Sequence, residues 1–199
     1  CGYHGWHDWY LSANLNKEDG LSSHLIPGLE PLGVPKKLKN TIFPFEYNDF
    51  KSLKSICEKN EIGVIKMEVI RNFGPKNNFL DKVRELASKL NIVLIFDECT
   101  SGFRETYGGI HLKYNVNPDL AMYGKTLGNG YAITAVVGKK EVMKHCVNSF
   151  LSSTFWSERI GPTAALATLN EMERIKSWKK ITKIGKYIKH NILKISKSN

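Results

Sequence analysis

Positions 91–98 read N-I-V-L-I-F-D-E, an unbroken apolar run that ends in the carboxylates Asp97 and Glu98. A short apolar run of this kind is typical of a β-strand that is buried on both faces of a sheet. In α/β proteins, ligands gather beyond the carboxyl ends of such strands. We therefore expect a strand over 92–96, and Asp97 at its end is the first candidate site residue.

A second apolar run, Leu120 to Tyr123, predicts another short strand and leads into Lys125. This lysine stands between Gly124 and the flexible sequence G-N-G at 128–130. A carboxylate at one strand end and a lysine at another are the parts that a pyridoxal phosphate enzyme needs. The lysine forms the Schiff base and the carboxylate partners the pyridinium nitrogen. Asp97 and Lys125 are therefore the candidate catalytic residues.

The rest of the chain alternates strand-like and helix-like patterns. An apolar run at 62–67 ends in Glu68, and the apolar residues of 79–90 recur on one helix face. Strand, helix and strand in this order predict parallel strands with a right-handed crossover. We also expect strands at 41–45 and 132–137, and helices at 49–58, 140–146, 163–175 and from 178 onward. The sequence thus predicts an α/β fold with a mostly parallel sheet and helices on both faces.

Composition indicates an ordinary globular protein. The chain has 199 residues, of which 42% are hydrophobic, and no apolar stretch approaches the roughly 20 residues of a membrane helix. The N-terminus lacks the pattern of a signal peptide, and the cysteines show no paired spacing. We therefore expect a cytoplasmic protein with reduced thiols and no membrane partner. Because the chain begins with Cys1 in the middle of a motif, we also expect it to be a fragment.

The formal net charge of +10 raises the question of an anionic partner. The lysines are spread along the chain, so a solvated lysine-rich surface is favoured over a nucleic-acid site. Their densest run lies in the amphipathic stretch after Trp178. Two roles were weighed for this helix, contact with a membrane surface and packing on a missing domain, and the second is favoured. No nucleic-acid partner is expected.

Two other chemistries were weighed and set aside. His4, His7 and Asp8 have the side chains of metal ligands, but no further ligand follows at a motif spacing, so no metal is expected. The Gly124-Lys125-Thr126 tripeptide is similar to the end of a phosphate-binding loop. That loop requires a glycine five positions before Gly124, where this chain has Asp119.

The motifs taken together resemble one family. They span nearly the whole chain: Gly2-Tyr3-His4-Gly5, Gly33-Val34-Pro35-Lys36, Phe45-Glu46-Tyr47-Asn48-Asp49, Asp97-Glu98-Cys99-Thr100-Ser101-Gly102-Phe103-Arg104, Pro118-Asp119-Leu120, Gly124-Lys125-Thr126-Leu127-Gly128-Asn129-Gly130 and Ser153-Thr154-Phe155. In these motifs the chain resembles the class III, fold-type I pyridoxal phosphate aminotransferases. Within that family it is similar to the relatives of glutamate-1-semialdehyde aminomutase.

The resemblance implies a role for each matching residue. Lys125 corresponds to the Schiff-base lysine and Asp97 to the partner of the pyridine nitrogen. Tyr3 is implied to stack on one face of the cofactor ring and Cys99, in place of the usual aliphatic residue, to press on the other. The remaining implied cofactor residues are Glu68 near the ring and the substrate, Thr154 binding the phosphate across a dimer interface, and His4 beside the site or in a structural role.

Two departures from the family pattern accompany this match. Val69 follows Glu68 where the family has a proline. The implied phosphate cup and the small C-terminal domain lie outside the chain. Residues 1–199 are thus expected to be the central part of the large pyridoxal-phosphate-binding domain, truncated at both ends. Such a fragment is expected to bind the cofactor poorly and to be inactive by itself.

The implied activity is pyridoxal-phosphate-dependent transfer of an amino group between a small-molecule donor and an acceptor, in a homodimer. The alternatives are an intramolecular aminomutase of the glutamate-1-semialdehyde type and a non-catalytic relative that keeps the dimer scaffold. Arg104 has two possible roles, a clamp for a substrate carboxylate and, favoured, a structural ion pair. The segment from Leu11 to Lys37 corresponds to a mobile stretch over the active site, with an exposed insertion as the alternative.

Overall fold

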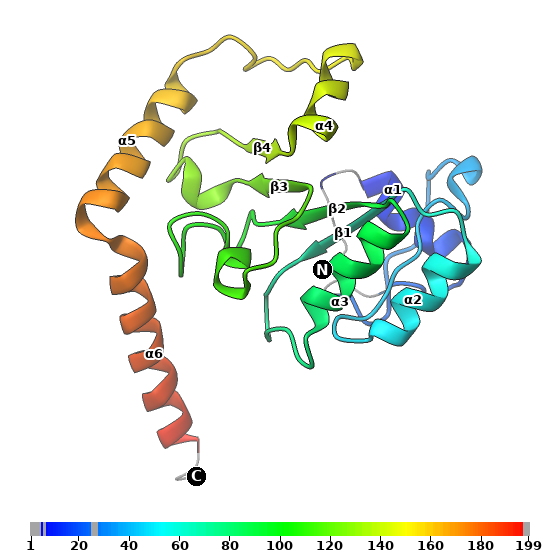
Figure 1. The fold of residues 1–199 in the computed structure, drawn as a ribbon, viewed down its shortest axis with the longest axis horizontal. Coiled ribbons are helices and arrows are strands. Elements are labelled where there is room, and N and C mark those ends of the chain that lie inside the picture. The colour runs from blue at the N-terminus through cyan, green and yellow to red at the C-terminus, as the bar shows by residue number, and fades with distance from the viewer. Residues whose placement is uncertain (1–4, 6, 25–27, 197–199) are drawn as a thin grey trace. The chain divides into compact units, whose positions relative to one another are not determined.

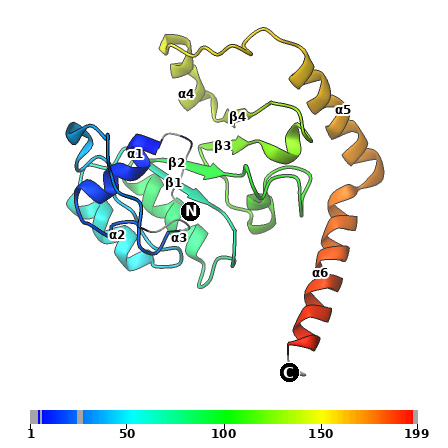
Figure 2. The same ribbon diagram turned by 180° about the vertical axis from the view of Figure 1, so that it is seen from behind.

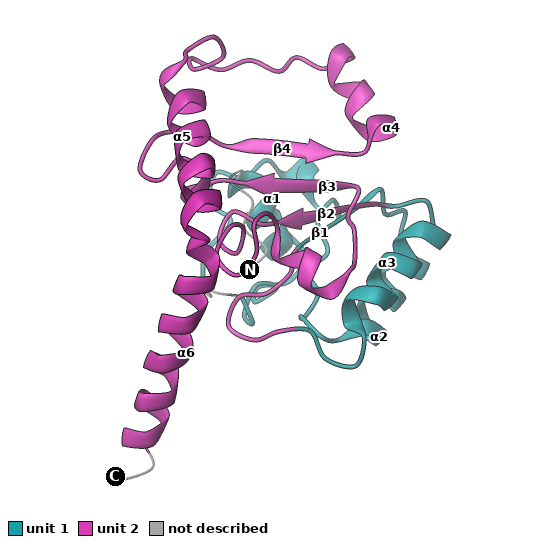
Figure 3. Ribbon diagram, turned by 60° about the vertical axis from the view of Figure 1, so that its left-hand side comes forward, with its two compact units in different colours: residues 1–67, 75–92 teal, residues 68–74, 93–199 magenta. Residues whose placement is uncertain are grey.

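The computed structural model describes residues 5, 7–24 and 28–196 (Figure 1). The chain divides into two compact units, coloured separately in Figure 3. Unit 1 comprises residues 1–67 and 75–92, and unit 2 comprises residues 68–74 and 93–199. The candidate catalytic residues both belong to unit 2.

Unit 1 carries helices and the first strand. Its elements are α1 (His7–Ser12), the 3-10 helices η1 (Ala13–Leu15) and η2 (Lys36–Leu38), α2 (Phe50–Lys59), β1 (Val64–Glu68, whose last residue is assigned to unit 2) and α3 (Phe79–Lys89). The predicted helix at 79–90 is confirmed, and its apolar face is buried through Phe79, Leu80, Val83, Leu86 and Ala87. The rings of Phe79 and Tyr47 pack in a T-shaped arrangement, with 5.2 Å between ring centroids.

The start of α2 is also as predicted. The side chain of Asp49 accepts a hydrogen bond from the backbone N–H of Ser52 at 3.0 Å, which satisfies one of the unpaired donors of the first helical turn. Leu53 and Cys57, one turn apart, are the residues that α2 buries. A polar cap followed by apolar residues at helical spacing is therefore sufficient to predict this helix.

The segment between α1 and η2 is partly anchored in unit 1. Leu21 is 1% exposed and forms a small core with Tyr10 and Ala13. Its backbone N–H donates to the side-chain oxygen of Asn14 at 3.1 Å. The expected role of residues 11–37 as a mobile stretch over an active site stays a prediction.

The expected strand at 41–45 is wrong. The structure has no strand at these positions, and the chain continues irregularly until the cap of α2. The apolar residues Ile42, Phe43 and Phe45 are only partly buried there. Pro44 has no backbone N–H to donate to a neighbouring strand, which removes part of the pairing that a strand requires.

Unit 2 carries the other strands and the long C-terminal helices. Its elements are β2 (Val93–Asp97), η3 (Ile110–Tyr114), β3 (Leu120–Tyr123), η4 (Lys125–Leu127), β4 (Ala135–Gly138), α4 (Lys140–Met143), η5 (Lys144–Asn148), α5 (Ile160–Ile175) and α6 (Ser177–Ile195). The strands predicted around 92–96, 120–123 and 132–137 are therefore present. The helices predicted at 163–175 and from 178 onward are present as well, whereas at 140–146 the α-helix ends at Met143 and continues as the 3-10 helix η5.

The sheet has the strand order β1-β2-β3-β4. Strand β2 pairs in parallel with β3, and Asp97 lies opposite Met122. Strand β3 pairs with β4 in the antiparallel sense, and Tyr123 lies opposite Ala135. The α/β fold with a mostly parallel sheet is thus confirmed, with β4 as an antiparallel member of a mixed sheet.

Burial in β2 alternates along the strand. Leu94 and Phe96 are fully buried, whereas the residues of the other face are half-buried. Asp119, directly before β3, ties the start of the two strands together, because its carboxylate accepts from the N–H of Leu94 at 2.8 Å. The same carboxylate forms an ion pair with Lys139 at 2.7 Å.

The C-terminal helix α6 keeps its apolar side chains exposed. Ile184 is 58% and Ile192 59% exposed, and no residue of this fully described helix is buried. Figure 2 shows its C-terminal half extending away from the strands of unit 2. In the described part of the chain, no helix combines the length and the apolar character needed to cross a membrane.

Candidate active site

Asp97 and Lys125 lie at the same edge of the sheet. The parallel register places Asp97 opposite Met122, so the chain reaches Lys125 three residues after that pair. Both residues therefore follow the carboxyl ends of neighbouring strands, where α/β proteins bind ligands. This arrangement is what the two apolar runs of the sequence predicted.

Lys125 opens η4 in an unusual backbone conformation. Its φ is 43°, in the left-handed region, where residues other than glycine are uncommon. The side chain is exposed, and its Nζ donates a hydrogen bond to the Oγ1 of Thr100 at 3.2 Å. The amine of Lys125 is thus held beside the turn that follows Asp97.

The Asp97 carboxylate is held by that turn. Its Oδ1 accepts a hydrogen bond from the backbone N–H of Cys99 at 3.1 Å, a local contact that restricts the side-chain rotamer. Asp97 is half-buried. The structure therefore presents a partly desolvated carboxylate with a fixed orientation at the end of β2.

Close packing surrounds Gly124. A Cβ at this position would lie 3.3 Å from the Sγ of Cys99 and 3.4 Å from the Cγ2 of Thr134. Any side chain here would crowd Cys99, so glycine lets the strand leading to Lys125 pass directly against that residue. Cys99 is half-buried, with its thiol beside the backbone that carries the lysine.

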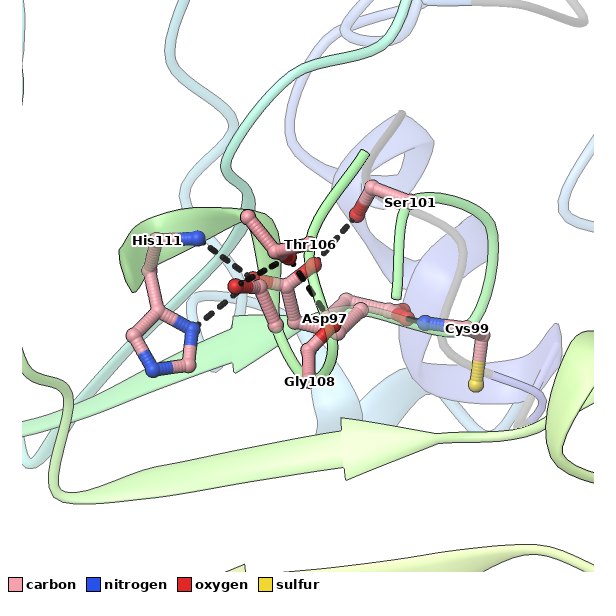
Figure 4. A network of polar contacts seen from close by, with 8 residues as sticks. Asp97, Cys99, Ser101, Thr106, Gly108 and His111 are labelled. Atoms are coloured by element: carbon pink, nitrogen blue, oxygen red, sulfur yellow. Dashed lines mark hydrogen bonds and ion pairs between the residues drawn. The ribbon is translucent and has the colours of Figure 1, made fainter. Parts of the chain in front are cut away.

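Glu98 accepts hydrogen bonds in a buried polar network, and its partners Ser101 and His111 are labelled in Figure 4. It is 1% exposed. Its Oε2 accepts from the hydroxyl of Ser101 at 2.6 Å, and its Oε1 accepts from the backbone N–H of His111 at 3.0 Å. The same Oε1 lies 2.9 Å from the ring Nδ1 of His111. Both partners are themselves buried.

These hydrogen bonds decide the ionisation of Glu98. Burial raises the pKa of its carboxyl, but the hydrogen bonds from the His111 side chain, from Ser101 and from the backbone of His111 and Ile110 outweigh this effect. The net pKa therefore lies below the ordinary glutamate value. Glu98 is a buried carboxylate at neutral pH.

Tyr123 precedes Gly124 and is excluded as a base at neutral pH. Burial of its phenol and the nearby charge of Glu98 raise its pKa to about 12, against a smaller opposing effect of a hydrogen bond with the backbone of Gly109. Its ring lies 5.3 Å from that of Phe103, centroid to centroid. The phenol therefore keeps its proton under physiological conditions.

Glu68 lies at the end of β1 and is 8% exposed. Its Oε1 accepts a hydrogen bond from the Nη1 of Arg71 at 2.9 Å, which pairs the buried charge. Arg71 follows the departure at Val69, where the family pattern has a proline. Glu68 is therefore paired with an arginine three positions later in the same chain.

The remaining residues named from the sequence are Tyr3, His4, Thr154 and Arg104. Tyr3 and His4 lie outside the described residues. Thr154 is exposed in a turn between η5 and α5, and it makes no hydrogen bond to either catalytic candidate in the described structure. Arg104 is exposed, and its Nε donates to the carbonyl of Thr100 at 2.6 Å. This contact is with a backbone oxygen, so both roles considered for Arg104, the carboxylate clamp and the ion pair, stay predictions.

Sequence reasoning missed the residues that hold this turn. The sequence patterns assigned no role in it to Thr100, Ser101 or His111. A signal for Glu98 was present, since residues 97 and 98 alternate across the strand and one of them must face the buried side. Nothing in the local pattern indicated its partner 13 positions away.

Comparisons with known proteins agree with this geometry. Residues 3–199 match the family model of the class-III aminotransferases. A 3-aminobutyryl-CoA aminotransferase from Cloacimonas acidaminovorans (strain Evry) is 41% identical over 182 residues, which cover 87% of this chain and 40% of the relative. A glutamate-1-semialdehyde 2,1-aminomutase from Sulfolobus acidocaldarius is 37% identical over 179 residues, covering 86% of this chain and 41% of the relative.

Solved structures show the same fold. An acetylornithine aminotransferase from Elizabethkingia anophelis superposes with a TM-score of 0.73 at 25% identity, covering 81% of this chain and 44% of that one. An omega-transaminase from Sphaerobacter thermophilus superposes with a TM-score of 0.71 at 25% identity, covering 85% of this chain and 42% of that one. The chain thus spans less than half the length of these proteins.

Proposed function

Because the chain belongs to the class-III aminotransferase family, we propose that the protein containing it transfers amino groups with pyridoxal phosphate as its cofactor. One observation carries the proposal. Lys125 and Asp97 follow neighbouring parallel strands in the same unit, and the lysine amine is hydrogen-bonded to the turn that begins at Asp97. The substrates are a small amino donor and a keto acid or aldehyde acceptor.

The residues present fit the cofactor of this family. When bound, pyridoxal phosphate supplies an aldehyde for amines and a ring that withdraws electrons from the reacting carbon. The half-buried carboxylate of Asp97 matches a protonated ring nitrogen, and the exposed amine of Lys125 matches the aldehyde. The cradle at Gly124, which a Cβ would fill, leaves the Cys99 side chain beside them.

Each side chain has a distinct task in this proposal. The Nζ of Lys125 would hold the cofactor through its aldehyde and would move a proton at the substrate carbon that bears the amino group. The carboxylate of Asp97 keeps the ring nitrogen protonated. Thr100 holds the lysine amine beside the site through the 3.2 Å hydrogen bond, which orients it before reaction.

Further cofactor contacts follow from the resemblance and belong to the same proposal. Tyr3 and Cys99 enclose the ring, Glu68 lies near the ring and the substrate, and His4 is beside the site. Thr154 binds the phosphate of the cofactor held by a second subunit, which requires a homodimer. Its exposure in the isolated chain is compatible with such a role. We also propose that the protein is cytoplasmic.

A second activity is supported by the relatives. Glutamate-1-semialdehyde 2,1-aminomutases share 37% identity with this chain in Sulfolobus acidocaldarius and 34% in Ignicoccus hospitalis. An aminomutase returns the amino group to the same carbon skeleton, whereas an aminotransferase passes it to a separate acceptor. We favour transfer to a separate acceptor, as in the 41% identical aminotransferase.

The test uses the full-length protein that contains this chain. It is loaded with pyridoxal phosphate, reduced with borohydride, digested and analysed by peptide mass spectrometry. A phosphopyridoxyl group on Lys125 alone is the expected result, and donor and acceptor screens then separate transfer from intramolecular exchange. The non-catalytic alternative predicts a label without turnover.

Two variants control this experiment. Lys125→Arg keeps the positive charge but removes the nucleophilic amine, so we expect neither label nor activity. Lys140→Arg makes the same change in α4, and its labelling should match that of the unmodified protein. An unlabelled Lys125 in the full-length protein would overturn the proposed function.

A further inference from the structure

Glu98 follows Asp97 directly and makes hydrogen bonds through its side chain and through both of its backbone groups. Its side chain holds Ser101 and His111, and its backbone carbonyl accepts from the N–H of Gly102 at 2.8 Å. Its backbone N–H donates to the carbonyl of Met122 at 2.8 Å, which ties the turn to β3. The turn at 98–102 is therefore held from its side chain and from both backbone groups of Glu98.

This turn carries the groups that contact the site. The N–H of Cys99 donates a hydrogen bond to the Asp97 carboxylate, and the hydroxyl of Thr100 accepts one from the amine of Lys125. A rotation of the turn would move both contacts together. The orientation of Asp97 and that of Lys125 are thus coupled through one short segment.

Gly109 lies close against the side chains of Glu98 and His111. A Cβ at Gly109 would lie 2.8 Å from the Oε1 of Glu98 and closer still to the ring of His111. Because glycine has no Cβ, the backbone at Gly109 can approach the buried Glu98 carboxylate closely. In Figure 4 the contacts of Ser101 and His111 converge from opposite sides of this network.

We propose that Glu98 is a positioning residue, which through Ser101 and His111 sets the geometry of the turn that orients Asp97 and Lys125 toward the cofactor. This inference rests on the proposed function. Glu98 acts through the turn and touches no reacting atom. Its effect is geometric, so a neutral side chain of the same shape should preserve it.

The test compares Glu98→Ala with Glu98→Gln in the full-length protein. Alanine leaves the donors of Ser101 and His111 unpaired and releases the turn. Glutamine keeps an acceptor for His111, and its amide can donate to the Ser101 hydroxyl, which reorients to accept. Displacement of catalytic groups by about 1 Å can cost on the order of 100-fold in rate, so we expect kcat of Glu98→Ala to fall about 10- to 100-fold.

Two measurements besides turnover test the positioning role of Glu98. The dissociation constant of pyridoxal phosphate from the apoprotein should rise in Glu98→Ala, and borohydride trapping at Lys125 should slow. Glu98→Gln should stay near the unmodified protein in both. If cofactor affinity and trapping fell equally in Glu98→Gln and Glu98→Ala, the negative charge of Glu98 would matter rather than the geometry of the turn. That result would overturn the proposal.

Asp119→Ala is the matched control for lost stability. Asp119 is also a buried carboxylate bonded to a backbone N–H and a side chain, but it lies at the opposite end of β3. It should lower the melting temperature without changing cofactor affinity or trapping. If Asp119→Ala lost as much cofactor affinity and trapping at Lys125 as Glu98→Ala, the proposal would be overturned.

Ser101→Ala serves if Glu98→Ala does not fold. It removes one donor from the Oε2 of Glu98 and keeps the carboxylate, so a smaller loss in the same direction is expected. Unchanged cofactor affinity and trapping in this variant would overturn the proposal. The unmodified protein distinguishes the two levels of inference, because absence of a label on its Lys125 defeats the proposed function, whereas a normal label with unaffected variants defeats only the role of Glu98.

Discussion

At the scale of single residues, Lys125 combines its chemistry with a backbone conformation that costs free energy. A left-handed residue with a Cβ is disfavoured by roughly 1–2 kcal/mol relative to the right-handed conformation. The φ of 43° places Lys125 in this region. Residues held in sparsely populated backbone regions cluster at functional sites, and the position of Lys125 follows that tendency.

Two substitutions of Lys125 separate its chemistry from its backbone strain. Lys125→Gly and Lys125→Ala both remove the amine, but only glycine adopts positive φ without penalty. We expect the glycine variant to be more stable than the alanine variant by about 1 kcal/mol. Urea unfolding of the two apoproteins measures this difference. An alanine variant of equal or greater stability would show that the left-handed conformation is not retained.

Glu98 predicts a dependence of stability on acid. Its folded-state pKa lies below the ordinary value, because hydrogen bonds from His111 and Ser101 outweigh the burial that raises it. A depressed pKa stabilises the fold above the unfolded-state value of about 4.3, and this contribution is lost as the pH falls through the lower folded-state pKa. The free energy of unfolding should thus decrease below about pH 4.5.

The comparison between unmodified protein and Glu98→Gln isolates this contribution. Glutamine does not titrate, so the stability that the unmodified protein holds over Glu98→Gln should decrease as the pH falls below the unfolded-state glutamate pKa of about 4.3 and through the lower folded-state pKa. Chemical denaturation at several pH values provides the measurement. A constant difference across this range would contradict a depressed pKa at Glu98.

At the scale of elements, α2 depends on its N-terminal cap. Asp49 accepts the hydrogen bond from the N–H of Ser52 at 3.0 Å and also places a negative charge at the positive end of the helix dipole. Asp49→Ala should lower the free energy of unfolding by about 1 kcal/mol, and Asp49→Asn, which still caps, should lower it by less.

Denaturant midpoints at constant m-value measure the effect on α2. Lys54→Ala is the control, because this exposed residue forms an ion pair with Glu58 at 3.6 Å in the same helix. Exposed pairs of this type contribute about 0.3–0.5 kcal/mol, so its effect should be smaller. A control that costs as much as Asp49→Ala would show that the cap has no special role.

At the scale of the whole molecule, the exposed apolar surface of α6 is the feature with a direct consequence in solution. Ile184, Ile188 and Ile192 recur at helical spacing and are all at least half exposed. Exposed apolar surface of this extent favours association and binding of hydrophobic ligands. The isolated 199-residue chain should therefore enhance the fluorescence of a hydrophobic dye and self-associate.

A pair of substitutions tests this expectation. Ile184→Lys with Ile188→Lys should reduce dye fluorescence and shift sedimentation toward the monomer. Lys183→Ala with Lys186→Ala, on the same helix, removes charge without removing apolar surface and should not reduce the fluorescence. Equal fluorescence from the unmodified chain and the double isoleucine variant would place the dye elsewhere.

The sequence by itself determined most of the elements of this protein and its two candidate catalytic residues, Asp97 and Lys125. Apolar runs at 92–96 and 120–123 identify strands, because burial depends on local pattern and side chains alternate at a fixed period. The capped pattern at α2 and the apolar face of α3 are local in the same sense. Asp97 and Lys125 follow from those strands, since parallel strands bring their carboxyl ends to one edge.

Only the tertiary structure decided how the turn that contacts both Asp97 and Lys125 is held in place. Glu98 meets His111 13 positions later, and Lys125 meets Thr100 25 positions earlier, contacts that no local pattern specifies. The missing strand at 41–45 and the antiparallel β4 have the same cause. Whether an apolar segment pairs, and in which direction, depends on hydrogen-bonding partners supplied by distant parts of the chain.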